Sequence, residues 1–513
     1  MVGNVFTYAT LGIDAIQLSV ECDASGSTHN VNIVGMATRA VQESKDRIFA
    51  ALRNSDVSIP THHYTINLAP ADIKKDSAAL DLPVAIAVMQ AIRQLPVQAL
   101  NKTAIIGELS LDGTLRPING ALPIAIAAKR DGIRVLILPS ENAEEAAIID
   151  DIEIIGVTSL RETVSYIRGE IDIQPTEVDR ERIFSVLNTF GVDMYDVRGQ
   201  YQVKRALEVS AAGGHNLLMI GPPGSGKTML ARRVPTILPE LNLEEALEAT
   251  KIHSVAGFSK EFQNGILTTR PFRSPHHSCS DVALVGGGAF PKPGEVSLSH
   301  RGVLFLDELP EFKRLVLEVL RQPLEDGVVT ISRATTSLTF PAEFMLIASM
   351  NPCPCGYYGS NIPNHECKCE SGSIQRYRNR VSGPLLDRID IHVEVPAVSY
   401  SDLTSLPVGD DSAAIRKRVN QARDIQVKRY QKDNIFCNSQ MGSRLLRKYC
   451  HLDKESQNLM EDAIDRLGFS ARVFDRILKV ARTISDLEGR TDILAEDISE
   501  AIQYRTLDRK YWI

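Results

Sequence analysis

The chain contains 513 residues, of which 43% are hydrophobic and 24% are charged, and its formal net charge is -7. This length predicts roughly two to four domains, and the composition is that of an ordinary globular protein. The net acidity excludes a molecule coated in basic surface. It does not exclude nucleic acid, because a ring can confine positive charge to a central pore.

No basic segment followed by a long apolar one opens the sequence, and no apolar run approaches the roughly 20 residues of a membrane helix. We therefore expect a cytoplasmic protein without a membrane partner. In that compartment, the eight cysteines are expected to be thiols or metal ligands rather than disulfides.

Residues 1–170 alternate short strands and helices, with strands expected at 16–20 and 32–34 and a helix at 40–53. The region resembles the proteolytic domain of Lon at 70–77 and 115–120. In that comparison the positions of the nucleophile and the lysine fall on Ala79 and near Leu122, so acyl transfer has no chemistry available. Ser77 lies two residues from the expected place and is interpreted as a capping or turn residue. We expect an inactive domain reused for binding or assembly.

A phosphate loop is predicted after the polar linker 171–185. The apolar run 216–220 predicts a strand, residues 229–233 predict a helix, and between them the pattern G-x-x-x-x-G-K-T places backbone N–H groups around a triphosphate. Lys227 would reach the β- and γ-phosphates and Thr228 would bind Mg²⁺; the alternative is a plain Gly-Pro turn. The predicted ATP-binding residues are Gly221, Pro222, Pro223, Gly224, Ser225, Gly226, Lys227 and Thr228.

A second apolar strand, 302–306, ends in Asp307 and Glu308. Asp307 is predicted to hold Mg²⁺ with Thr228, and Glu308 to polarise the attacking water. An exposed strand end would be the ordinary interpretation of such a pair, but after a phosphate loop the pair predicts ATP hydrolysis.

Three further polar residues follow in an order that suits this chemistry. Asn351 ends the apolar strand 344–349 and is a candidate sensor of the γ-phosphate. Arg388 follows the apolar pair at 385–386 and is a candidate arginine finger for a neighbouring subunit, which implies a ring. Arg472 opens a helix of the C-terminal region and is suited to touch the nucleotide.

Two insertions in this core are candidate DNA contacts. Residues 270–301 are rich in Gly and Pro and carry Arg273 and Lys292, and residues 328–339 alternate like a hairpin with Arg333 near the tip. Such cations would bind phosphates without reading sequence. An ordinary solvated charge is an equally good interpretation of any one of them.

Four cysteines cluster after Asn351 at a spacing that suits a tetrahedral Zn²⁺ site. Their one-residue separations are tighter than the usual C-x-x-C, so free thiols stay an alternative. The candidate ligands are Cys353, Cys355, Cys367 and Cys369. The remaining cysteines are expected to pack as small apolar residues.

From residue 401 the pattern becomes helical, with helices expected at 413–430, 455–467, 471–488 and 495–504. The resemblance of the chain to known proteins is carried by short motifs. The motifs at 196–200, 212–216, 270–277, 293–300, 351–356 and 382–388 resemble those of the YifB/ComM proteins, which are AAA+ ATPases of the magnesium-chelatase type. The resemblance spans essentially the whole chain.

The resemblance implies an α/β fold in four parts: a degenerate Lon-protease-like domain (1–170), a linker (171–185), a P-loop ATPase core with hairpin insertions (186–400) and a helical lid (401–513). It also implies ATP and Mg²⁺ as cofactors, and a homo-hexamer that moves branched DNA during recombination. Relatives of this type, including replicative helicases, project hairpins at the two insertions into the ring. The alternative is a protein-remodelling or metal-chelatase ATPase without direct action on DNA.

Overall fold

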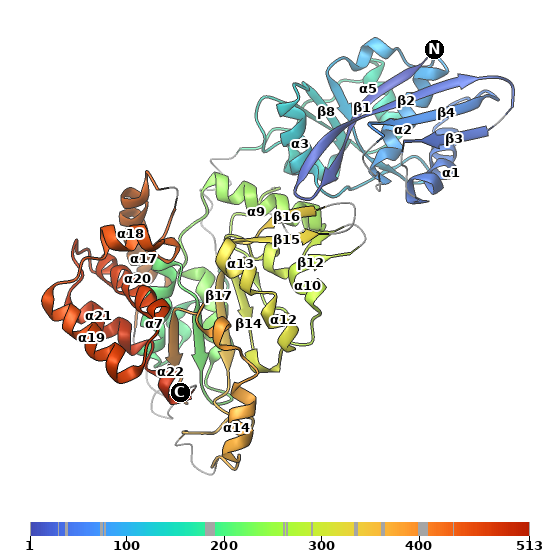
Figure 1. The fold of residues 1–513 in the computed structure, drawn as a ribbon. Helices are drawn as coiled ribbons and strands as arrows, with labels where there is room; N and C mark the ends of the chain where they lie inside the picture. Colours follow the sequence, from blue (N-terminus) through green and yellow to red (C-terminus); the bar gives the residue numbers. More distant parts are fainter. Residues whose placement is uncertain are drawn as a thin grey trace. The chain divides into compact units, whose positions relative to one another are not determined.

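The computed structural model describes residues 2–28, 30–35, 39–71, 75, 78–179, 190–259, 262, 265–288, 291–332, 337–360, 365–398, 409–433 and 435–511. They form two compact units, each described here by itself (Figure 1). The first unit contains the N-terminal residues to 187 together with 243–268, and the second contains 188–242 and 269–513. Among the described helices, none has both the length and the apolar character needed to cross a bilayer.

The first unit is built on a seven-stranded mixed sheet. Its strand order is β3-β4-β2-β1-β5-β8-β9, in which β1, β2 and β4 pair antiparallel and the other neighbours pair parallel. The strands are β1 (Gly3–Leu11), β2 (Asp14–Ser25), β3 (Asn30–Val34), β4 (His63–Ala69), β5 (Thr103–Ile105), β8 (Val135–Pro139) and β9 (Glu153–Val157). A small hairpin joins β6 (Glu108–Leu109) and β7 (Leu115–Arg116).

The helices of this unit are α1 (Arg39–Asn54), α2 (Asp81–Ala91), α3 (Ala121–Arg130), α4 (Ala143–Ala146), α5 (Leu160–Ile167) and α9 (Leu243–Ala256). Every residue of α2 is buried, as its apolar sequence requires. The predicted strands at 16–20 and 32–34 and the helix at 40–53 are confirmed. Residues 171–179 carry no helix or strand, and the rest of the predicted linker lies outside the described residues.

The two positions that correspond to Lon's catalytic pair are buried and apolar. Ala79 lies in a short 3-10 turn, and Leu122 lies in the first turn of α3. The main chain beside Leu122 is already engaged by α9, since the Gly120 amide donates to the Ser254 carbonyl at 3.2 Å. Leu122 donates its amide to Glu145 at 3.0 Å, and Ser254 also donates to this carboxylate. Ser77 lies outside the described residues.

We therefore expect no peptide cleavage by this chain, because the positions where Lon carries its nucleophile and base hold Ala79 and Leu122 instead. A peptide-cleavage assay with ATP should give no signal above that of Lys227→Ala protein. Cleavage that disappeared in Ser77→Ala would contradict this expectation.

The second unit contains a five-stranded parallel sheet with the order β11-β14-β17-β10-β18, which confirms the predicted parallel arrangement. Its strands are β11 (Phe272–Arg273), β14 (Val303–Leu306), β17 (Met345–Met350), β10 (Leu217–Ile220) and β18 (Ile391–Glu394). Two hairpins accompany the sheet: β12 (Gly286–Gly287) with β13 (Lys292–Pro293), and β15 (Val328–Ser332) with β16 (Ser337–Pro341).

The helices around this sheet are α7 (Tyr201–Gly213), α8 (Lys227–Arg233), α10 (Asp281–Val285), α11 (Glu295–Leu298), α12 (Arg314–Glu318), α13 (Arg321–Asp326), α14 (Ser371–Arg378) and α15 (Gly383–Leu386). The C-terminal helices are α17 (Ser412–Tyr430), α18 (Ser443–Tyr449), α19 (Lys454–Leu467), α20 (Ala471–Leu487), α21 (Ala495–Gln503) and α22 (Leu507–Tyr511). All four helices expected after residue 401 are present, and α18 and α22 are additions.

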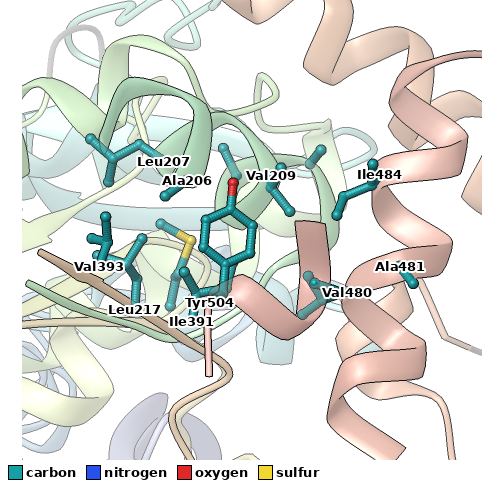
Figure 2. Close-up of a cluster of buried hydrophobic side chains, with 14 of the residues drawn as sticks. Ala206, Leu207, Val209, Leu217, Ile391, Val393, Val480, Ala481, Ile484 and Tyr504 are labelled. Carbon is teal, nitrogen blue, oxygen red and sulfur yellow. The ribbon is translucent and has the colours of Figure 1, made fainter. Parts of the chain in front are cut away.

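One hydrophobic core joins the sheet to the C-terminal helices. Figure 2 shows side chains of α7, β10 and β18 meeting those of α20, with Tyr504 among them. The labelled residues are Ala206, Leu207, Val209, Leu217, Ile391, Val393, Val480, Ala481, Ile484 and Tyr504. The C-terminal helices thus pack against α7, which leads directly into β10, the strand that precedes the predicted phosphate loop.

A buried polar cluster reinforces this junction. The His215 ring bridges Asp390 (3.1 Å) and Thr483 (2.8 Å), and Arg476 of α20 also donates to Asp390. A side chain at Gly213 would collide with the His215 ring at 2.2 Å, so this position requires glycine. Burial alone would raise the pKa of the Asp390 carboxyl, but Arg476 and His215 outweigh it and hold that pKa well below its usual range.

Arg476→Leu is expected to lower the free energy of unfolding by roughly 3 kcal/mol, because it leaves a buried carboxylate short of its cation. Folding lowers the pKa of Asp390. The ionised carboxylate therefore makes its full contribution to the free energy of unfolding above about pH 4, and this contribution shrinks as the pH falls. The difference between wild type and variant should therefore narrow in acid. Denaturant unfolding between pH 3 and pH 7 measures it. Arg472→Ala, on the exposed start of the same helix, is the control and should change stability by less than about 0.5 kcal/mol.

Candidate ATPase site

The loop between β10 and α8 has the backbone expected of a phosphate cradle. Gly224 and Gly226 adopt φ values of +75° and +89°, which other residues reach only at a cost. A side chain at Gly221 would collide with the Val395 carbonyl oxygen at 2.2 Å. The predicted strand, loop and helix around residues 221–228 are therefore present, and the amide groups at the start of α8 are available to an anion.

Lys227 folds back over this loop. Its ammonium group donates to the carbonyls of Gly221 (2.7 Å) and Pro222 (2.9 Å) and to the Asn351 side-chain oxygen (3.2 Å). Burial lowers the pKa of Lys227 to about 8, although Asp307 and the neighbouring Glu308 oppose that shift. The three oxygens are neutral acceptors, which phosphate oxygens can replace.

The two candidate Mg²⁺ ligands are in direct contact. Thr228 donates its hydroxyl to Asp307 at 2.7 Å, and the Ser349 hydroxyl of β17 donates to the other oxygen of the same carboxylate. A hydroxyl and a carboxylate held together in this way form a suitable oxygen pair for Mg²⁺. Ser349 was not anticipated from the sequence, since nothing but the pairing of β14 with β17 brings it to Asp307.

Glu308 and Asn351 flank this pair from two strands. Glu308 follows β14 in the left-handed region, with φ of +54°, and its side chain is 53% exposed. Asn351 follows β17, which lies between β14 and β10. Because the carboxyl ends of parallel strands meet at one sheet edge, the carboxylate, the amide and the phosphate loop lie together.

The two candidate arginines lie in different environments. Arg388 is only 8% exposed and binds within its own chain, to the Glu325 carboxylate of α13 and the Pro384 carbonyl. Asn216 also holds its backbone, through a 2.9 Å bond to the Arg388 carbonyl. Arg472 is exposed in the first turn of α20, after the N-cap Ser470. Action of Arg388 on a neighbour would require its guanidinium to leave Glu325.

The four clustered cysteines converge. Their sulfur atoms all lie within 4.8 Å of one another, with Cys353 at 3.3 Å from Cys355 and 3.7 Å from Cys367. A tetrahedral site with Zn–S bonds of about 2.3 Å has edges of about 3.8 Å, so the donor set fits such a metal. Burial raises the pKa of Cys355, but the Tyr357 amide and neighbouring thiols outweigh it and bring the pKa to about 7, which favours the thiolate.

This cluster abuts the phosphate loop. A side chain at Gly356, between Cys355 and Tyr357, would collide with the Pro223 ring at 2.5 Å. Arg378 of α14 donates twice to the Pro352 carbonyl at 3.0 Å and packs on the Tyr511 ring of α22 at 4.4 Å. The segment after Asn351 is thus held between the phosphate loop and the C-terminal helix.

The three candidate DNA contacts differ in how available they are to a ligand. Arg273 makes a bidentate ion pair with Glu295: its Nε and Nη2 donate to the two carboxylate oxygens at 2.7 and 2.8 Å. Lys292 is exposed on β13. The hairpin expected at 328–339 is confirmed, but Arg333 lies outside the described residues.

Comparison with known proteins agrees with this fold and site. Residues 193–403 match the family described as magnesium chelatase, subunit ChlI; residues 20–142 match subunit ChlI of Mg-chelatase, and 409–505 its C-terminal region. The fold and the site therefore define an AAA+ ATPase of the magnesium-chelatase type, a class that uses ATP and Mg²⁺.

Individual relatives narrow the class further. The chain is 41% identical to competence protein ComM of Haemophilus influenzae and 42% identical to the uncharacterized protein YifB of Escherichia coli, each over 507 residues covering 98% of this chain and 97% of the relative. It belongs to the YifB/ComM family. It is also 27% identical over 183 residues to Lon protease 2 of Bacillus subtilis, covering 33% of this chain and 32% of that protein, which confirms the Lon likeness.

Proposed function

We propose that this chain assembles into a hexameric ring that hydrolyses ATP and moves along branched DNA, as a branch-migration motor in recombination or transformation. The observation that carries the proposal is the position of the hairpin β12–β13, in which Lys292 is exposed while Gly286 and Pro293 are buried. It lies in the one segment that joins β11 to β14, the strand that ends in the catalytic acids. Lys292, a cation on that hairpin, therefore lies a short distance along the chain from the strand that ends in Asp307 and Glu308.

The relatives support the same proposal. One relative is named competence protein ComM, and the identity to it extends over nearly the whole of both chains. The site residues assigned above keep their proposed roles here: Lys227 and the phosphate loop bind ATP, and Thr228 and Asp307 hold Mg²⁺. Glu308 activates water, Asn351 senses the γ-phosphate, and Arg472 touches the nucleotide. A motor on chromosomal DNA would act in the cytoplasm.

The test measures binding and ATP turnover with single-stranded, duplex and four-way DNA, with and without an ATP analogue, at several salt concentrations. Four-way DNA should bind best in the presence of the analogue and should stimulate turnover. Lys292→Ala should weaken binding and its salt dependence, while Lys454→Ala, which removes an exposed cation from α19, is the charge-matched control and should change neither. If no DNA binds or stimulates at low salt, the alternative of protein remodelling without DNA takes its place.

We also propose that the four clustered cysteines bind one Zn²⁺ per chain, because four convergent thiolates form the commonest structural zinc site. Elemental analysis should find zinc in wild type, and Cys367→Ser should lose it. Cys279→Ser, an isolated cysteine, is the matched control and should keep it. Chelation should loosen the segment after Asn351 without unfolding the unit. Metal content near zero in anaerobically purified protein would favour free thiols.

A further inference from the structure

A strongly basic segment spans α17, the loop after it and α18. Residues 412–452 contain ten Lys and Arg residues but only two acidic ones, although the formal net charge of the whole chain is -7. Several of the arginines are used internally, since Arg418 pairs with Glu208 and Arg429 pairs with Asp486. Toward the end of α17 and on α18, four exposed cations form no ion pair with any described residue: Lys428, Lys432, Arg447 and Lys448.

Two contacts hold the end of α17 against α18 (Figure 1). The Tyr449 hydroxyl of α18 donates to the Arg429 carbonyl at 3.2 Å, and Arg444 of α18 pairs with Asp433, just after α17, at 2.9 Å. Along α18 the exposed cations are three and four residues apart, so they share one side of the helix. These contacts gather the exposed cations into one cluster, called here the α17–α18 patch: Lys428, Lys432, Arg444, Arg447 and Lys448.

An exposed aromatic ring lies on the loop between these two helices. Phe436 is 46% exposed, and its amide donates to the Gln440 side chain at 2.8 Å, which holds this part of the loop in place. The Arg301 guanidinium packs over the ring, 5.6 Å from its centroid. Exposed rings beside cations are the platforms on which the bases of single-stranded nucleic acids stack.

The same loop contacts the base of the β15–β16 hairpin. Gln440 donates to the Glu343 carboxylate at 3.4 Å, and Arg301 donates to the same carboxylate at 2.7 Å. Glu343 follows β16 and lies against Gly327, which precedes β15, so that a side chain added at Gly327 would meet it at 2.9 Å. Phe436 therefore lies beside the root of a hairpin that is itself a candidate DNA contact.

We propose that the α17–α18 patch and Phe436 form a binding site for single-stranded DNA, in which the cations contact phosphates and the ring stacks on an unpaired base. Cations alone would suit any polyanion. The exposed ring favours unpaired bases, because the bases of a duplex are already stacked on one another. This inference rests on the proposed function and extends it, since it gives DNA a second contact apart from the β12–β13 hairpin.

The first test removes two cations of the patch from the full-length protein. Lys428→Ala/Lys432→Ala should bind a labelled oligothymidine of about 30 nucleotides roughly tenfold more weakly than wild type at low salt. The plot of log affinity against log salt should become shallower by about 1.4, because each phosphate contact with a single strand contributes about 0.7. Lys417→Ala/Lys454→Ala removes two exposed lysines outside the patch and should bind as wild type does.

Cations in the last turn of a helix also stabilise the helix dipole, and the same variants separate that role from DNA binding. If Lys428 and Lys432 served only the end of α17, their removal would lower the melting temperature without changing the affinity for oligothymidine. Equal affinities of the two double variants would therefore overturn the proposal.

The second test concerns the ring. Phe436→Leu keeps an apolar side chain against Arg301 but has no ring, and it should weaken oligothymidine binding by roughly five- to thirtyfold while leaving duplex binding within about twofold. Phe436→Tyr keeps the ring and should bind as wild type does. An abasic strand of the same length, which has phosphates but no bases, should bind wild type and Phe436→Leu equally. If Phe436→Leu weakened neither DNA, or both alike, stacking on Phe436 would be rejected.

Failure of the proposed function gives a different result. If Lys292→Ala weakens binding of four-way DNA but Lys428→Ala/Lys432→Ala binds oligothymidine like its control, the motor stands and the α17–α18 patch is wrong. If the patch variant loses oligothymidine binding while no DNA stimulates turnover, the patch stands and the motor is wrong. If wild type binds no DNA at low salt, both are wrong.

Discussion

Lys227→Ala is expected to weaken ATP binding by roughly a hundredfold, because the variant loses charge-assisted hydrogen bonds to phosphate worth about 2–3 kcal/mol. In the structure the Lys227 ammonium already lies at the phosphate loop, where its three acceptors are neutral carbonyl and amide oxygens. When ATP binds, charged phosphate oxygens would replace these neutral acceptors. Titration with a fluorescent ATP analogue measures the loss.

Glu308→Gln should bind ATP as wild type does, while its turnover falls by roughly 10² to 10⁴. The amide keeps the shape of the side chain but cannot polarise water as a carboxylate does. Glu311→Gln is a matched control, since Glu311 lies three residues further on and binds Arg380 at 2.8 Å. Equal losses of ATP binding in Lys227→Ala and Glu308→Gln would contradict the division of roles.

Arg388→Ala is expected to retain ATP binding and to lose turnover by roughly 10³ if its guanidinium completes a neighbour's site. Mixing it with Lys227→Ala protein should restore part of the activity. In mixed rings, some interfaces then pair an intact phosphate loop with an intact arginine. ATP should also promote hexamers, so turnover per chain should rise with protein concentration.

The intrachain contact of Arg388 with Glu325 provides a variant that distinguishes action on a neighbouring subunit from a purely intrachain role. Glu325→Gln weakens that contact and should leave turnover unchanged or higher if the arginine acts on a neighbour. If Arg388 served only to bind Glu325, both variants would lose stability together, and mixing with Lys227→Ala would restore nothing.

Short motifs made the ATPase site predictable from the sequence. The phosphate loop, the acids after β14 and the amide after β17 are each set by a few consecutive residues, and a parallel sheet brings such strand ends to one edge. The spacing of the cysteines likewise anticipated their convergence. Periodicity was sufficient for four of the C-terminal helices, whereas α18 and α22, of seven and five residues, gave patterns that were too short.

Contacts between distant residues were not predictable in this way. His215 meets Asp390 and Thr483, and Arg388 meets Glu325, only because helices and strands far apart in sequence pack together. Likewise, no local signal marks residues 243–268 as part of the first unit, where Ser254 binds Glu145 and the Gly120 amide. A single sequence carries no information on such partners.

Movement of a four-way DNA junction by the purified protein tests the central claim most directly. With ATP and Mg²⁺, wild-type protein should convert a labelled movable junction into its duplex products, and Lys227→Ala and Glu308→Gln should not. The non-hydrolysable analogue should support binding without product. Wild-type protein that hydrolyses ATP but yields no product from any branched substrate at low salt would contradict the account.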